Sequence, residues 1–311
     1  MVSSLLKASL LVVIVSLCVG VRIVGAEGFL SSWSSPTSIW LRSVEMVSVD
    51  DGWAVGGGVY RWNGASWSTV TSPIGTWRSV FMVSVDDGWA VGDNTLKDHG
   101  VIMRWNGTLW SNVTSPTSEY LTSVFMVSAN DGWAVGRNGT IVHWNGSVWS
   151  TVPSPIRASW FWLYSVYMVN ASDGWAVGNG GKIIRWNGTT WNNFTSPVTA
   201  ALWSVFMVGA DDGWVVGDGG TILRWNTAEW SNVTSPTTAW LFSVSVVNPD
   251  VGWAVGAHGT IIRWTGIEWI PEFPAGILAS LLISVTLIAV ILAKRSSKKI
   301  RKPSLLNKTR L

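Results

Sequence analysis

The chain has 311 residues, which is enough for two ordinary domains or for one longer repeat fold. Its formal charge of +3 comes from the two ends, because eight Lys and Arg follow residue 293 while residues 27–274 hold 11 basic and 18 acidic side chains, a net charge of −7. A nucleic-acid-binding domain needs a basic patch on its folded part, so no nucleic acid is expected as a partner.

The first predicted element is a secretory leader. Residues 8–21 form an uncharged apolar run behind Lys7. As a helix they would span about 21 Å, less than the roughly 30 Å of a bilayer core. Small residues at 24–26 offer a cleavage site, so we predict a signal peptide over residues 1–26, with an uncleaved anchor as the alternative. The only cysteine, Cys18, lies in this run, so the mature fold must depend on packing without a disulfide.

The middle of the chain, residues 27–270, repeats one unit six times. Each unit contains DGWAVG or a close variant, whose tryptophans are Trp53, Trp89, Trp133, Trp175, Trp214 and Trp253. Their spacings of 36, 44, 42, 39 and 39 residues lie in the range of propeller blades. The repeat therefore sets the fold class before any single strand is assigned.

Each unit predicts four short strands, named A to D here. Strand A is an alternating SVxMV segment, strand B is GWAVG, strand C is TIIRW or a variant, and strand D is a WSxV segment that a Ser-Pro pair ends. Asp-Gly between strands A and B and Asn-Gly between strands C and D predict tight hairpin turns. We therefore predict an all-β fold, a six-bladed β-propeller of four-stranded antiparallel blades.

Two ways of closing the ring compete in the sequence. The first and last units still match the consensus, which favours a closed ring over a linear solenoid with polar end caps. Two segments compete for the last strand D, namely residues 33–36 near the N-terminus and the segment around Trp269. The N-terminal strand is the preferred interpretation, which would leave residues 267–274 as a stalk.

Tryptophan is unusually abundant, with 25 residues, and three recur in each unit, where we expect them to pack between blades. Further aromatic residues fall in the D-to-A connections, which should emerge on one face of the ring. Exposed there, they would stack on sugars or anchor a protein partner, whereas the alternative is that they cap the core beneath the loops. These candidate ligand-binding residues are Trp40, Trp77, Tyr120, Trp160, Trp162, Trp203 and Trp240.

The other repeated polar positions predict structure rather than chemistry. Arginine recurs at one strand C position, with His143 in the third unit, which favours pairing with carboxylates or stacking on tryptophan. Strand A carries an aromatic residue at one position in four units, but Glu45 in the first and Ser245 in the last. The glutamates fall in different units, so no carboxylate pair of a glycosidase is evident. We expect no catalytic residues, no metal and no cofactor, and a protein that is not an enzyme.

Eight Asn-x-Ser/Thr sequons lie within the repeats. In a secreted chain each is a candidate glycosylation site, although Asn-Gly turns beside Ser and Thr also create sequons by chance. The eight are Asn106, Asn112, Asn138, Asn145, Asn170, Asn187, Asn193 and Asn232.

The last elements predict a membrane anchor. Residues 275–293 are 19 uncharged residues, long enough to span a bilayer as a single helix. The basic tail 294–311 follows, and the positive-inside bias places it in the cytoplasm and the propeller outside. Residues 271–274 (PEFP) link the two parts.

Two segments resemble known families. The unit LxSVxMVSxxDGWAVGxxGTIIRW resembles the repeat of the photosystem II stability and assembly factor type, which is related to BNR or Asp-box propellers. This resemblance implies a propeller of a kind that serves as assembly aid, lectin or sialidase. The PEF motif, apolar span and basic tail resemble the archaeal PEF-type C-terminal sorting signal, which implies processing by a membrane transpeptidase and transfer to a surface anchor.

Together these features predict a cell-surface propeller, held at the membrane by one span, that binds or scaffolds glycans or envelope proteins. Two alternatives stay open. One is a sialidase-like surface glycosidase, and the other is a purely architectural, glycosylated envelope protein.

Overall fold

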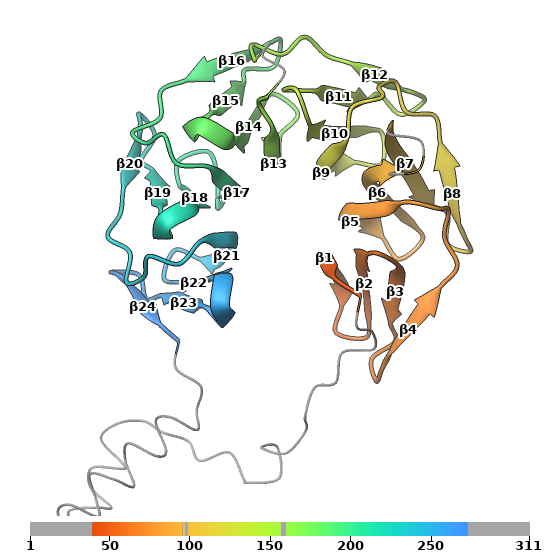
Figure 1. The fold of residues 1–311 in the computed structure, drawn as a ribbon, viewed down its shortest axis with the longest axis horizontal. Helices are drawn as coiled ribbons and strands as arrows, with labels where there is room; N and C mark the ends of the chain where they lie inside the picture. Colours follow the sequence, from red (N-terminus) through yellow and green to blue (C-terminus); the bar gives the residue numbers. More distant parts are fainter. Residues whose placement is uncertain (1–38, 95, 97–98, 157–159, 273–311) are drawn as a thin grey trace, which may run out of the picture. The chain divides into compact units, whose positions relative to one another are not determined.

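The computed structural model describes residues 39–94, 96, 99–156 and 160–272, and these form six four-stranded antiparallel sheets (Figure 1). The predicted six-bladed propeller is therefore confirmed. The leader, the expected span at 275–293 and the tail lie outside the described residues. Within those residues no helix has the length and apolar character that a membrane crossing requires.

Each sheet uses four consecutive strands, with strand A innermost and strand D outermost (Figure 1). Sheets 1 to 3 consist of β1 (Leu41–Ser48), β2 (Asp51–Gly56), β3 (Val59–Trp62) and β4 (Trp67–Val70); β5 (Thr76–Ser84), β6 (Asp87–Asn94), β7 (His99–Trp105) and β8 (Trp110–Val113); and β9 (Leu121–Ser128), β10 (Asp131–Gly136), β11 (Ile141–Trp144) and β12 (Trp149–Thr151). Sheets 4 to 6 consist of β13 (Leu163–Asn170), β14 (Asp173–Gly178), β15 (Ile183–Trp186) and β16 (Trp191–Phe194); β17 (Leu202–Met207), β18 (Gly213–Gly217), β19 (Ile222–Trp225) and β20 (Trp230–Asn232); and β21 (Leu241–Asn248), β22 (Val251–Gly256), β23 (Ile261–Trp264) and β24 (Trp269–Pro271).

The Asp-Gly pair does not form the A–B turn, contrary to the sequence prediction. In sheet 4, Asp173 already pairs with Asn170 and Gly174 with Met168, so both lie in strand β14. The glycine is needed because a Cβ at Gly174 would lie 2.3 Å from the sulfur of Met168. The predicted C–D turn is confirmed, since Gly188 has φ +89 and Asn187 Oδ1 accepts hydrogen bonds from the two backbone amides that follow the turn.

The aspartate of that pair binds the repeated arginine instead. Arg185 Nε donates to Asp173 Oδ1 at 2.8 Å and Nη2 donates to Oδ2 at 3.1 Å. The guanidinium lies 4.8 Å from the ring centroid of Trp175 and 5.5 Å from that of Trp225 in the next sheet. Equivalent pairs recur in sheets 1, 2 and 5, and a histidine replaces the arginine in sheet 3. The prediction of a structural arginine series is confirmed.

Sheet 6 breaks this pattern, because Val251 replaces the aspartate. Arg263 Nε is buried there without a hydrogen-bond partner among the described residues. We expect Val251→Asp to raise the free energy of unfolding by roughly 1 kcal/mol or less, as befits a partly exposed pair. Urea unfolding measures this change, and Val251→Asn, which adds no charge, should give a smaller gain; an equal gain would contradict an ion-pair effect.

Neighbouring sheets join by a repeated tryptophan insertion. Trp175 of strand B packs against both Trp225 and Trp230 of the next sheet, and its ring centroid lies 4.8 Å from the first and 5.3 Å from the second. The backbone N–H of Val205 donates to Ser165 Oγ across the same interface at 3.2 Å. Both features recur between all five consecutive pairs of sheets, which explains why this spacing of tryptophans specifies a propeller.

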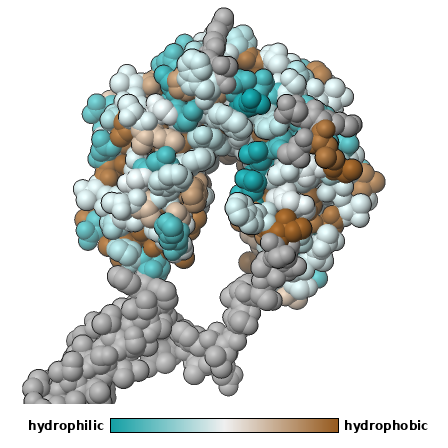
Figure 2. All heavy atoms as spheres, in the orientation of Figure 1, coloured by the Kyte–Doolittle hydropathy of each residue, from teal (hydrophilic) through white to brown (hydrophobic). Residues whose placement is uncertain are grey.

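Sheets 1 and 6 do not meet in this way. Consecutive innermost strands pack on one another from β1 to β21, but β1 and β21 have no comparable packing within the described residues, and the side chains leave an opening between the two sheets (Figures 1 and 2). Trp253 is 37% exposed, whereas the equivalent Trp175 is fully buried. The expected closed ring is thus open between its first and last sheets.

The prediction that the N-terminal segment supplies the last strand D of sheet 6 is wrong. Trp269 begins β24, which pairs with β23 and completes sheet 6 from its own repeat. The segment around Trp269 is therefore a blade strand, not a stalk, and residues 33–36 lie outside the described residues.

Candidate recognition surface

The strand order gives the propeller two different faces. We call one the connection face, which carries the D-to-A links between sheets and the B–C turns, for example residues 195–201 and 218–221. The opposite turn face carries the A–B and C–D turns, for example residues 171–172 and 187–190. Residues on one face come from all six sheets, so a single ligand or surface can contact several repeats at once.

The seven aromatic candidates fall into three settings, of which the first is the core. Trp77 is 1% exposed, because it holds the position at the start of strand A that leucine holds elsewhere. In the register of strand pairing, Trp77 opposite Gly92 corresponds to Leu163 opposite Gly178. Trp77 is therefore a core residue, and the core-capping alternative holds for it.

Three candidates are exposed tips of the connection face. Trp40, Trp160 and Trp240 are 81%, 68% and 50% exposed. They come from the start of sheet 1, the link to sheet 4 and the link to sheet 6. We call them the tip tryptophans.

The remaining candidates, Tyr120, Trp162 and Trp203, are partly buried and belong to a continuous row of rings. Together with Tyr164 and Phe242 they form what we call the aromatic arc. Its ring centroids are separated by 6.3 Å (Tyr120–Trp162), 6.4 Å (Trp162–Tyr164), 4.2 Å (Tyr164–Trp203) and 5.9 Å (Trp203–Phe242). The arc runs over sheets 3 to 6 where the innermost strands begin, and Trp240 meets its end 6.5 Å from Phe242.

Strand geometry explains the arc. Trp162 and Tyr164 flank the buried Leu163, and alternate residues of a strand point to the same side. Sequence analysis missed Tyr164 and Phe242, since only the links were considered. The available signal was the residue directly after the buried leucine of strand A, which is Tyr164, Trp203 and Phe242 in sheets 4 to 6.

Two arginines lie over the first rings of the arc. The guanidinium of Arg137 is 5.6 Å from the ring centroid of Tyr120 and 6.0 Å from that of Trp162, and Arg78 is at 5.8 and 5.9 Å. Arg78 forms an ion pair with the buried Asp93, and Arg137 lies 3.8 Å from Glu119. Cation–π contacts of this kind hold the positive charges at the surface of the arc.

Hydrogen bonds fix the arc in place. Asn179 Oδ1 accepts from the backbone N–H of Trp162 at 2.7 Å, and Trp203 Nε1 donates to Asp218 Oδ1 at 2.6 Å. Burial, and secondarily the negative charge of Asp218, raises the pKa of Tyr164. The phenol, which is neutral at neutral pH in any tyrosine, thus keeps its proton to a higher pH than a solvated tyrosine does.

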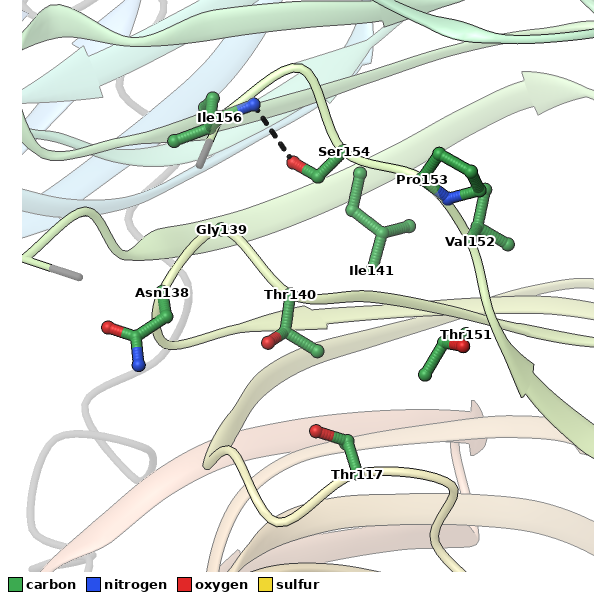
Figure 3. Close-up of a pocket in the computed structure, with 10 residues that line it drawn as sticks. All are labelled: Thr117, Asn138, Gly139, Thr140, Ile141, Thr151, Val152, Pro153, Ser154 and Ile156. Atoms are coloured by element: carbon green, nitrogen blue, oxygen red, sulfur yellow. Dashed lines mark hydrogen bonds between the residues drawn. The ribbon is translucent and has the colours of Figure 1, made fainter. Parts of the chain in front are cut away.

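A cavity of about 640 Å³ lies beside this surface, where the B–C turn of sheet 3 meets two D-to-A links (Figure 3). Its lining is mostly threonine and aliphatic, from Thr117, Thr140, Ile141 and Ile156 among others. Asn138, in left-handed backbone at φ +58, also lines it, and its buried Oδ1 has no partner among the described residues. No residue of the aromatic arc lines this cavity.

Four of the eight sequon asparagines lie on the turn face. Asn106, Asn145 and Asn187 lie in C–D turns, and Asn170 ends β13 beside an A–B turn. Asn138 belongs to the B–C turn of sheet 3, on the connection face, and the other three lie exposed on outermost strands, namely Asn112, Asn193 and Asn232. Glycosylation itself stays a prediction, and half of its candidate sites lie on the turn face.

The four glutamates of the repeats that a glycosidase would use lie in different parts of the fold. Glu229 and Glu268 lie in C–D turns of the turn face, Glu45 lies within β1, and Glu119 approaches Arg137. Among the described residues no three His, Cys, Asp or Glu side chains converge as a metal site would require.

No protein-family model and no curated protein matches the chain. Solved structures share its fold, among them YCF48 bound to D1 peptide, at 17% identity and a TM-score of 0.61, covering 76% of this chain and 81% of that chain. YCF48 from Cyanidioschyzon merolae has 17% identity and a TM-score of 0.60, and the match covers 77% of this chain and 87% of that chain. A virginiamycin B lyase from Staphylococcus aureus with quinupristin has 14% identity and a TM-score of 0.65, and the match covers 77% of this chain and 85% of that chain.

Identities this low show the fold alone. The YCF48 structures support the propeller that the assembly-factor resemblance implies. Because the same fold also carries a lyase, the likeness does not select a function, which has to be argued from the surface itself.

Proposed function

We propose that this protein is a membrane-tethered propeller on the outer side of a cell membrane, and that its aromatic arc binds a polypeptide segment of another envelope protein. It acts as a binding or scaffolding module and not as an enzyme. The observation that carries the proposal is the row of five rings with two arginines above it, fixed across four sheets on one face.

The chemistry of the arc favours a polypeptide over a glycan. Aromatic and arginine side chains are the residues that most often dominate protein interfaces. A lectin stacks sugar rings on free aromatic faces, but Tyr164 and Trp203 already stack on each other at 4.2 Å with 21° between their planes. The fold-sharing YCF48 structure contains a bound peptide, which agrees with this choice without deciding it.

Site-specific photo-crosslinking in native membranes tests the proposal. A photoreactive amino acid in place of Phe242, at the end of the arc, should capture a polypeptide. The matched control replaces Ile267, which is 88% exposed on the turn face, and should capture none. Adding Trp203→Ala should reduce the yield at position 242 at least tenfold, because loss of a central interface tryptophan costs 2 kcal/mol or more as a rough figure.

Other outcomes point elsewhere. A glycan array that binds the wild-type chain and loses binding in Trp203→Ala would move the proposal to glycans. No capture at either position, with the fold intact, would favour a purely architectural envelope protein.

A further inference from the structure

Both ends of the folded part leave it on the connection face. Strand β1 begins at Leu41 opposite Gly56, at the B–C end of sheet 1. At the other end, the backbone N–H of Glu272 donates to Ile261 O at 2.8 Å, at the B–C end of sheet 6. Two residues separate Glu272 from the predicted span at 275–293, and they reach about 7 Å when extended. A span there would hold the connection face close to the bilayer.

The exposed side chains of this face suit a lipid surface. The three tip tryptophans are the most exposed tryptophans of the described residues, and Ile74 and Leu96 are 75% and 84% exposed on the same face. Tryptophan prefers the membrane–water interface, where its ring is apolar and its N–H is hydrated.

The wide spacing of these five exposed side chains indicates a flat surface rather than a small ligand. They come from the start of sheet 1, the link to sheet 2, the B–C turn of sheet 2, and the links to sheets 4 and 6. A compact ligand at one of them would miss the others, whereas a flat surface can meet all of them together.

The turn face differs from the connection face in its aromatic content and its charge. It exposes aliphatic tips too, such as Val49 and Ile267, but no exposed aromatic ring of the described residues stands among them. The A–B and C–D turns and the strand ends beside them carry eleven carboxylates against five arginines. Anionic headgroups would repel this excess of negative charge. Glycans at Asn106, Asn145 and Asn187, if attached, would hold the turn face away from lipid.

From these four observations we propose that the connection face rests on the lipid surface, with Trp40, Trp160 and Trp240 in the headgroup region. This inference rests on the membrane tether of the proposed function. It adds an orientation, in which the turn face points away from the membrane. The aromatic arc then faces polypeptide segments of partner proteins that emerge from the same membrane.

Depth-dependent fluorescence quenching tests the orientation. The full chain, with Cys18 replaced by serine where the leader is retained, is reconstituted in vesicles of phosphatidylcholine and phosphatidylglycerol. A thiol-reactive fluorophore is attached to Ser118→Cys on the connection face or to Val148→Cys on the turn face, both exposed and both beside sheet 3. Spin-labelled lipid should quench the probe at 118 and leave the probe at 148 unquenched.

The tip tryptophans have their own test. Changing all three to serine should cut quenching at 118 at least twofold, while serine at Val49, Leu109 and Ile267 of the turn face should leave it unchanged. Equal quenching at 118 and 148, or none at 118 in a chain that resists carbonate extraction, would overturn the orientation and keep the tether. Release of the chain by carbonate would instead overturn the tether, and the orientation with it.

Discussion

Replacing Trp175 with alanine is expected to lower the free energy of unfolding by about 3–5 kcal/mol, the usual cost of removing a fully buried large aromatic side chain. The ring is fully buried and contacts Trp225 and Trp230 of the next sheet and Phe194 of its own. Its loss leaves a cavity between two sheets and also removes a ring on which Arg185 stacks. Urea unfolding followed by circular dichroism measures the change.

Trp253→Ala is the matched control. Trp253 holds the same repeat position in sheet 6 but is 37% exposed beside the opening, where no tryptophan pair of a next sheet surrounds it within the described residues. Its loss should cost about 1 kcal/mol, well below the cost at Trp175. An equal cost at both positions would contradict an open ring and show that sheets 1 and 6 pack together in solution.

The fold was predictable because each repeat carries the same strand and turn residues. Tryptophan at one strand B position and two more in strands C and D recur in all six units, Asn-Gly between strands C and D recurs in four of them, and each unit became a sheet. Periodicity of this strength does not depend on any single strand assignment.

What the sequence could not supply was register within the links. Trp77 and Trp203 look alike as aromatic residues before strand A, yet one fills the buried leucine position and the other lies one residue later, in the aromatic arc. A shift of one residue in a strand moves a side chain to the other side. The Asp-Gly pair misled for a related reason, because a common turn sequence can serve an arginine partner and a tight glycine contact inside a strand.

The opening between sheets 1 and 6 was also beyond the sequence. Both sheets carry the consensus residues of a joined interface, so the pattern predicts contact whether or not the curvature of the other five interfaces brings the ends together. Only Glu45 and Ser245, which replace the aromatic residues of strand A in the first and last sheets, hinted that these sheets differ.

Glu45→Gln is expected to stabilise the protein at pH 8 and to have little effect at pH 4. Burial raises the pKa of Glu45 to about 7, and its carboxylate has no ion-pair or hydrogen-bond partner among the described residues. It stands at the end of a row in which Phe81, Phe125 and Tyr167 contact one another at centroid distances of 4.9 and 4.7 Å. An unpartnered charge in such a setting is unfavourable, and protonation relieves it.

The sign of the pH dependence follows from proton binding. The folded state holds the proton of Glu45 more tightly than the unfolded state does, so its stability is fully present below the unfolded pKa of 4.5 and is lost as the pH rises towards about 7. Glutamine cannot ionise, so the variant keeps that stability, a gain of about 1–3 kcal/mol at pH 8 once partial solvation of the site is allowed for. Glu229→Gln on the exposed turn is the control for the chemical change. Urea midpoints from pH 4 to pH 8 should diverge between wild type and Glu45→Gln across this window, and parallel curves would show that Glu45 is solvated in the folded protein.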